Sequence, residues 1–168
     1  MADGKAHTYF AMATGVGMAA YVAKEQTGLD FWLQLLGAVI GARCTGKLPD
    51  IFEPPISSNH WGSFHSIGMG GTITAQANRI SDIRNFCQSQ ADQCKNNPTR
   101  ILMITLAEGV SFSVVLDGTV RTILSFVERC LWLIIAGFVV GAPTGYVSHL
   151  ALDALTCKRS LPLLTKGC

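Results

Sequence analysis

The sequence predicts an all-α protein, a small helical bundle with four transmembrane helices. Three observations lead to this prediction. Asp, Glu, Lys and Arg make up only 14% of the 168 residues, against about 25% in ordinary soluble domains. Hydrophobic residues make up 49%, which excludes a disordered chain. The apolar residues also gather in runs that contain closely spaced glycines. The net charge of +2 gives no basic footprint, so no nucleic-acid partner is expected.

Four stretches carry almost no charge: residues 8–23, 31–42, 101–116 and 130–152. Glu108 interrupts the third, either as a functional acid inside the bundle or as a residue at a water-filled end of a short span. A helix needs about 20 apolar residues to cross a bilayer. Only the fourth stretch reaches this length, so a very apolar soluble bundle remains the alternative.

Glycine spacing favours the membrane over the soluble alternative. Gly37 and Gly41 form one GxxxG pattern, and Gly137, Gly141 and Gly145 form two overlapping ones. Small residues at every fourth position allow membrane helices to approach closely. In the interior of a soluble helix each glycine would mainly cost about 1 kcal/mol.

The distribution of basic residues predicts the topology. Turns at 24–30 and 117–129 on one side carry Lys24, Arg121 and Arg129, which are three of the 13 Lys and Arg. The other side carries the remaining ten: Lys5, Arg43, Lys47, Arg79, Arg84, Lys95, Arg100, Lys158, Arg159 and Lys166. By the positive-inside rule both termini are cytoplasmic. We therefore expect a multi-pass protein of a bacterial-type inner (plasma) membrane.

The whole chain, 1–168, reads as one membrane-embedded helical domain. A polar segment at about 75–100 is expected to form a helical or irregular insertion outside the membrane. This segment contains Cys87 and Cys94, which could pair only in an oxidising compartment. The predicted cytoplasmic side is reducing, so we expect free thiols.

Histidines and acids gather at one end of the predicted bundle. All four histidines fall there: His7, His60, His65 and His149. Three acids accompany them: Asp50, Glu53 and Asp153. His149 and Asp153 are four residues apart, so they project from one helical face. A single histidine on an apolar helix is more often a core residue, but four at one end favour a divalent-metal site, with zinc first.

Several motifs resemble the YdjM-type family of LexA-regulated, membrane-bound metal-dependent hydrolases. They are the early His7, the LPD box with Asp50 and Glu53, the H-x4-H-S element from His60 to Ser66, and the G-Y-x-x-H-x-x-x-D helix from Gly145 to Asp153. Together they extend over nearly the whole chain. The resemblance implies kinship with the all-α zinc-dependent phospholipase C and nuclease group, which hydrolyses phosphoesters at di- or trinuclear zinc centres.

These features predict a metal-dependent hydrolase that acts on a phosphoester or lipid-like substrate through metal-activated water. The expected metal ligands are His7, Asp50, His60, His65, His149 and Asp153. Glu53 is the candidate catalytic base, or else a bridging ligand. Ser66 is expected to cap a helix, with a hydrogen bond to a metal ligand as the other reading.

Two other functions remain open. A non-enzymatic membrane protein could use a structural metal to hold its cytoplasmic loop, but six or seven ligands exceed one closed tetrahedral site. Transport is a more distant reading, because the histidines and acids cluster at one end. The expected partners are the lipid bilayer and a small-molecule or lipid substrate. The sequence does not specify the substrate, the number of metal ions or the oligomeric state.

Overall fold

The computed structural model describes residues 4–52, 66–96 and 118–156, and every regular element within them is a helix. The helices are α1 (Gly4–Val22), α2 (Gly28–Thr45), α3 (Leu48–Phe52), α4 (Ile67–Ala75), α5 (Ala77–Asn96) and α6 (Gly118–Thr156). The predicted all-α class is therefore confirmed. Two of the four apolar stretches lie in α1 and α2, and the fourth lies in α6. The third, 101–116, falls outside the described residues.

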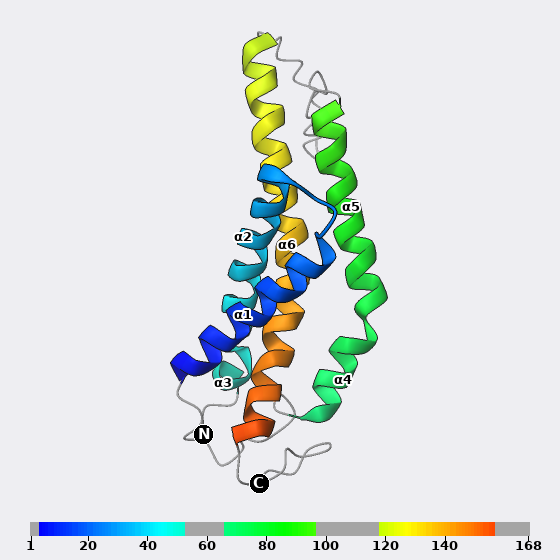
Figure 1. Ribbon diagram of the computed structural model, residues 1–168. Coiled ribbons are helices and arrows are strands. Elements are labelled where there is room, and N and C mark those ends of the chain that lie inside the picture. Colours follow the sequence, from blue (N-terminus) through cyan, green and yellow to red (C-terminus); the bar gives the residue numbers. More distant parts are fainter. Residues whose placement is uncertain (1–3, 53–65, 97–117, 157–168) are drawn as a thin grey trace, which may run out of the picture.

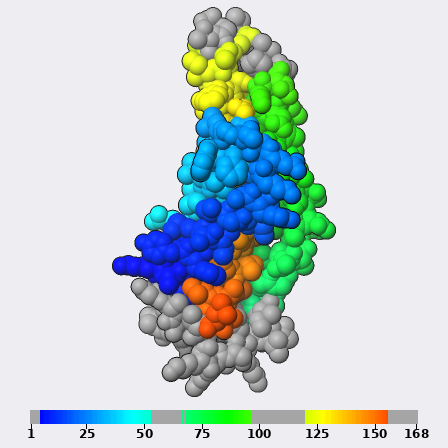
Figure 2. Space-filling model, in the orientation of Figure 1, coloured from blue at the N-terminus to red at the C-terminus, as the bar shows by residue number. Residues whose placement is uncertain are grey.

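The central element is α6, a helix of 39 residues that is about 58 Å long at 1.5 Å per residue. Helices α1, α2 and α5 all pack against it. Figure 1 shows that α2 runs in the same direction as α6, whereas α5 runs in the opposite direction. The start of α1, the short helix α3 and the end of α6 lie at one end of the molecule. The beginning of α6 extends past α1 and α2 at the other end (Figure 2).

Glycines bring α2 and α6 into backbone contact. A Cβ added at Gly137 would overlap the carbonyl oxygen of Gln34 and lie 2.7 Å from its carbonyl carbon. A Cβ at Gly41 would lie 2.7 Å from the carbonyl oxygen of Phe138, and one at Gly141 would lie 2.5 Å from the Cα of Ala38. The close helix approach expected from the GxxxG spacing is therefore confirmed, since these positions leave no room for a side chain.

The predicted turn at 117–129 is wrong, because α6 begins at Gly118 and is helical throughout this range. Its first turns pack beside the end of α5, where Ser125 Oγ donates a hydrogen bond to the carbonyl oxygen of Cys94, at 3.0 Å. The sequence offered no sign that the polar segment would pack beside these residues. Helix α6 also continues through Pro143.

The polar segment is helical, which is one of the two forms expected for it. It forms α5, which packs against α6 in the bundle. Arg84 donates hydrogen bonds to α1 and α2, and Phe86 contacts Trp132 of α6. Because α5 carries the chain away from the α3 end, Lys95, which follows Cys94, lies at the end of the bundle where α6 begins. The assignment of Lys95 to the other side was therefore wrong, which weakens the basic asymmetry.

Two local predictions about side chains are confirmed. Ser66 is the N-cap of α4, and its side chain accepts a hydrogen bond from the Met69 amide at 3.1 Å. Cys87 and Cys94 are buried thiols that are not joined in a disulfide. Burial raises the pKa of the Cys87 thiol, which favours its protonated, unreactive form.

One described helix, over Val120–Leu155, is long and apolar enough to cross a membrane. Its outer face exposes an apolar stripe: Leu124, Val127, Leu131, Ile135 and Phe138. On α2 a second stripe is exposed at four-residue spacing, formed by Trp32, Leu36 and Ile40. Surfaces of this extent are uncommon on soluble monomers, so the structure indicates membrane association in this coarse sense.

Candidate metal centre

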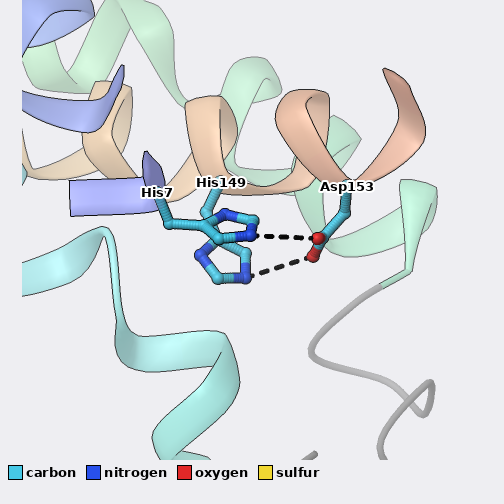
Figure 3. A group of neighbouring side chains, drawn as sticks. All are labelled: His7, His149 and Asp153. Atoms are coloured by element: carbon cyan, nitrogen blue, oxygen red, sulfur yellow. Dashed lines mark ion pairs between the residues drawn. The ribbon is translucent and has the colours of Figure 1, made fainter. Parts of the chain in front are cut away.

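Three helices contribute side chains to a buried cluster at the α3 end of the molecule. His7 lies in the second turn of α1, Asp50 lies in α3, and His149 and Asp153 lie one turn apart on α6. Figure 3 shows both imidazoles directed at the Asp153 carboxylate. His7, His149 and Asp153 are 3%, 0% and 1% exposed, although buried charges and polar groups are costly unless they are paired. Such burial indicates a dedicated polar centre.

The distances place these groups within reach of a single cation. His7 Nε2 lies 3.3 Å from Asp153 Oδ1, and His149 Nε2 lies 3.2 Å from Asp153 Oδ2. One potential ligand atom from each residue lies within 4.8 Å of the others. The two imidazoles are stacked, with ring centroids 4.1 Å apart. The expectation that His7 and His149 lie close together is therefore confirmed, although 142 residues separate them in the sequence.

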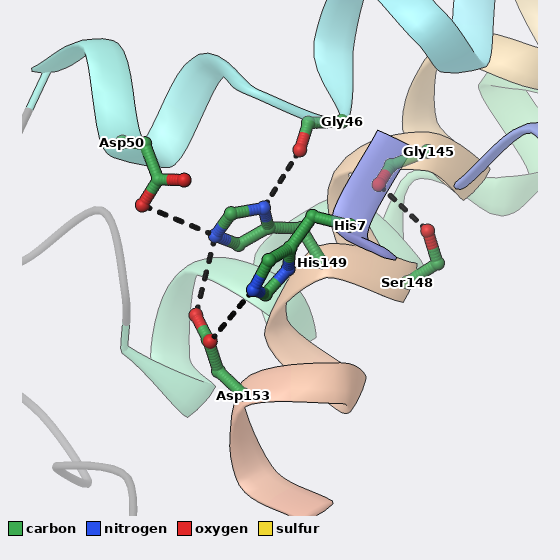
Figure 4. A network of polar contacts seen from close by, with 7 residues as sticks. All are labelled: His7, Gly46, Asp50, Gly145, Ser148, His149 and Asp153. Atoms are coloured by element: carbon green, nitrogen blue, oxygen red, sulfur yellow. Dashed lines mark hydrogen bonds and ion pairs between the residues drawn. The ribbon is translucent and has the colours of Figure 1, made fainter. Parts of the chain in front are cut away.

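Asp50 extends the cluster toward solvent. Its Oδ1 lies 3.5 Å from His149 Nε2, and its side chain is 30% exposed, whereas that of His149 is fully buried. Figure 4 shows Asp50 and Asp153 approaching the same ring nitrogen of His149, Nε2, from two different helices. The cluster thus has three buried members and one member at its accessible edge.

A backbone carbonyl orients His149. Nδ1 of His149 lies 2.7 Å from the carbonyl oxygen of Gly46, at the end of α2 (Figure 4). A carbonyl oxygen can only accept, so Nδ1 carries the proton and Nε2 is turned toward Asp50 and Asp153. Metal-binding histidines commonly donate their second ring N–H to a carbonyl in this way.

The surroundings of His149 Nε2 determine what the cluster can bind. A neutral imidazole with its proton on Nδ1 presents a lone pair at Nε2. That lone pair faces the oxygens of two carboxylates, which also carry only lone pairs and negative charge. A positive charge between them, either a proton or a metal ion, removes this repulsion. The arrangement therefore suits a cation held by nitrogen and oxygen ligands.

Sequence reasoning named four of the residues that the structure brings together: His7, Asp50, His149 and Asp153. Three further predicted residues, Glu53, His60 and His65, lie outside the described residues. The Gly46 carbonyl was missed, and no sequence signal could have found it. The glycine itself is explained by packing, because a Cβ at Gly46 would lie 2.6 Å from the Cβ of Ala11 on α1.

Comparisons with known proteins do not extend this picture: no family model matches the sequence, and no significant match is found among curated proteins or solved structures. The resemblance to the YdjM-type hydrolases therefore stays a prediction.

Proposed function

We propose that the protein is a membrane-bound, metal-dependent hydrolase whose metal centre includes His7, His149 and Asp153. The observation that carries this proposal is the buried cluster, with His149 oriented by the Gly46 carbonyl. Asp50 is the fourth ligand in the proposal. Zinc is the first choice, because two imidazole nitrogens and carboxylate oxygens are typical zinc ligands.

The chemistry of the donor set fits a divalent cation. Two neutral imidazoles and two carboxylates carry a formal charge of −2, which a divalent ion balances. His60 and His65 remain proposed ligands of the same or a second ion, as the H-x4-H-S element suggests. A bound divalent ion would supply Lewis acidity and lower the pKa of water it binds toward neutrality. Each residue around the bound ion would then have a distinct task.

The proposed tasks follow from position and burial. Asp153 keeps both imidazoles turned toward the centre, since its two oxygens each face one ring. The Gly46 carbonyl holds the proton of His149 on Nδ1 and leaves Nε2 as a ligand atom. Asp50, which is partly exposed, marks the edge at which a phosphoester or lipid-like substrate would enter. Glu53, three residues after Asp50, would accept the proton of the attacking water.

Hydrolysis by the purified full chain tests this proposal. We expect the zinc- or manganese-loaded protein to cleave at least one member of a panel of phosphodiesters, phosphomonoesters and lipid esters, and to lose this activity with a chelator. Glu53→Gln keeps the size of the side chain but cannot accept the proton, so it should retain metal while losing hydrolysis. An active Glu53→Gln variant would remove Glu53 from the role of base. Absence of hydrolysis across the panel would contradict the enzyme itself.

A structural metal site is the second candidate, and the near-complete burial of His7, His149 and Asp153 favours it. Structural sites are closed by four protein ligands, whereas catalytic sites keep a position for water. The partial exposure of Asp50 supports the catalytic alternative. A metal whose removal unfolds the protein, in a protein with no hydrolytic activity, would favour the structural role.

The membrane part of the proposal retains four transmembrane helices, both termini in the cytoplasm and a bacterial-type inner membrane. The apolar stripes on α2 and α6 and the span Val120–Leu155 support it. The outward face of α5 sets a condition on any arrangement, since Arg79, Asp82, Asp92 and Lys95 are exposed there. Charges of this kind are too costly for a lipid-facing surface, so this face must meet water, headgroups or another chain.

Fractionation and reporter fusions test the membrane arrangement. We expect the protein to stay with the membrane after an alkaline carbonate wash and to need detergent for extraction. Reporters fused after Cys168 should read cytoplasmic, and reporters inserted within 24–30 should read the opposite side. A C-terminus outside the cytoplasm would contradict the topology, and extraction without detergent would contradict the membrane assignment.

A further inference from the structure

A cavity of about 480 Å³ lies between α1, the α4–α5 segment and α6. One wall is a stripe of α1 with Phe10, Met18 and Val22, and another is a stripe of α6 with Val140, Pro143 and Val147. The α1 stripe extends for about 18 Å at 1.5 Å per residue. The volume lies in the range of small-molecule sites, about 300–1,000 Å³. Its shape is that of an elongated apolar slot.

Four of the five hydroxyl groups in the walls do not make the cavity polar, because their hydrogen bonds stay within their own helices. Thr14 donates to the carbonyl oxygen of Phe10, Thr74 to Gly70, and Thr144 to Val140. Ser148 likewise donates to Gly145. These side chains therefore place no hydrogen-bonding demand on a molecule in the cavity.

Arg84 brings a charged side chain into the lining. Its guanidinium donates to the carbonyl oxygen of Val22 at 3.3 Å, to Gln34 Oε1 at 3.2 Å and to Asn85 Oδ1 at 3.3 Å. All three acceptors are neutral, and no carboxylate in the described part of the chain forms an ion pair with it. Burial lowers the pKa of Arg84, yet arginine stays charged at physiological pH.

A second arginine in the same bundle shows the contrast. Arg129 of α6 forms an ion pair with Asp30 of α2, and both side chains are mostly buried. Among the described residues, Arg84 is half-buried without such a partner, in a wall that is mostly apolar. A partly desolvated charge without a counter-charge is unfavourable, so the position suits an anion delivered by a ligand.

We propose that this cavity binds a long-chain carboxylate, a fatty acid, with its chain along α1 and α6 and its carboxylate on Arg84. Arginine pairs with carboxylates through charge-assisted hydrogen bonds. Arg84 is the only cation that the described residues contribute to the lining, and one positive charge matches a monoanionic carboxylate better than a phosphate dianion. The apolar walls would cover the chain, as in most small-molecule sites.

The site is separate from the metal centre and does not depend on the proposed hydrolysis. Phe10, Ser148 and Ala151 line the cavity. Phe10 lies within a turn of His7 on α1, and Ser148 and Ala151 lie within a turn of His149 on α6. None of His7, Asp50, His149 and Asp153 belongs to the lining. A bound fatty acid would thus lie beside the cluster without contacting it.

Binding of radiolabelled palmitate to the full chain, purified in a nonionic detergent, tests this inference. We expect one palmitate per chain, displaced by unlabelled palmitate but not by hexadecanol, which has the same chain without the charge. Arg84→Gln should weaken binding by about tenfold or more, as expected for loss of a hydrogen bond to a charged group. Arg79→Gln, an exposed arginine of α5 outside the cavity, should bind as the wild type does.

A second variant leaves the contacts of Arg84 intact. Ala77→Phe places a ring in the cavity and should abolish palmitate binding, whereas Asn78→Phe, at an exposed position outside the lining, should not. Equal binding of palmitate and hexadecanol would overturn the role of Arg84. Tighter binding of lysophosphatidate than of palmitate would overturn the carboxylate, and unchanged binding by a folded Ala77→Phe variant would overturn the cavity.

Discussion

Gly137→Ala should destabilise the protein by at least about 3 kcal/mol, at the upper end of the range for overpacked cores. The added methyl group would overlap the carbonyl oxygen of Gln34 and lie 2.9 Å from its Cα. These are backbone atoms of a neighbouring helix, so no side-chain rotation can relieve the overlap. Helices α2 and α6 must move apart, and the contacts at Gly37, Gly41 and Gly141 would loosen with them. Thermal unfolding in detergent measures the effect.

Gly17→Ala provides the matched control for this prediction. Gly17 lies in the interior of α1, is exposed, and has no atom within 4 Å of an added Cβ. Alanine should therefore stabilise α1 by up to about 1 kcal/mol through its helix propensity. Equal stability of the Gly137→Ala and Gly17→Ala proteins would mean that α2 and α6 are not in backbone contact.

Much of the bundle was predictable because its determinants are local. Gly37, Gly41, Gly137, Gly141 and Gly145 stand at helical spacing in the sequence, and this spacing alone indicates a surface on which another helix can lie closely. Which helix it contacts was not encoded locally. The pairing of α2 with α6 depends on how the apolar faces of all the helices are buried in one arrangement.

The start of α6 and the position of α5 show where local reasoning ends. Residues 118–129 contain Arg121, Glu128 and Arg129, which resemble a turn when charge is the only guide. They are helical because α5 and α2 pack beside them: Ser125 donates to the Cys94 carbonyl of α5, and Arg129 pairs with Asp30 of α2. Such long-range contacts cannot be read from a window of a few residues.

The candidate site was predictable in its residue types and only partly in its geometry. His149 and Asp153 share a helical face by their spacing, but their approach to His7 depends on α1 crossing α6 near its end. The Gly46 carbonyl could not be predicted, since every residue has a carbonyl and only the tertiary fold selects one. The same holds for Arg84, which is one of 13 Lys and Arg in the sequence. Only the tertiary fold places it in the wall of an apolar cavity.

Asp153→Asn should weaken metal binding by more than about 100-fold. Asparagine keeps the size of the side chain but removes the charge and one carboxylate oxygen, and Asp153 is the residue that faces both imidazoles. Loss even of a partner outside the ligand sphere typically costs about 10–100-fold in affinity, so loss of a ligand should exceed this. Ser148→Ala is the matched control, because Ser148 is a buried neighbour on α6 whose hydroxyl bonds only within its own helix.

Calorimetric titration of the metal-stripped, purified chain with Zn²⁺ tests the central claim most directly. The proposed centre predicts saturable binding of at least one zinc ion by the wild-type and Ser148→Ala proteins, and a more than 100-fold loss in a folded Asp153→Asn variant and in a second variant, His7→Asn, on α1. Circular dichroism establishes that each variant is folded. Absence of saturable zinc binding by the wild-type protein, or equal affinity in the wild-type and Asp153→Asn proteins, would contradict a metal centre at His7, His149 and Asp153.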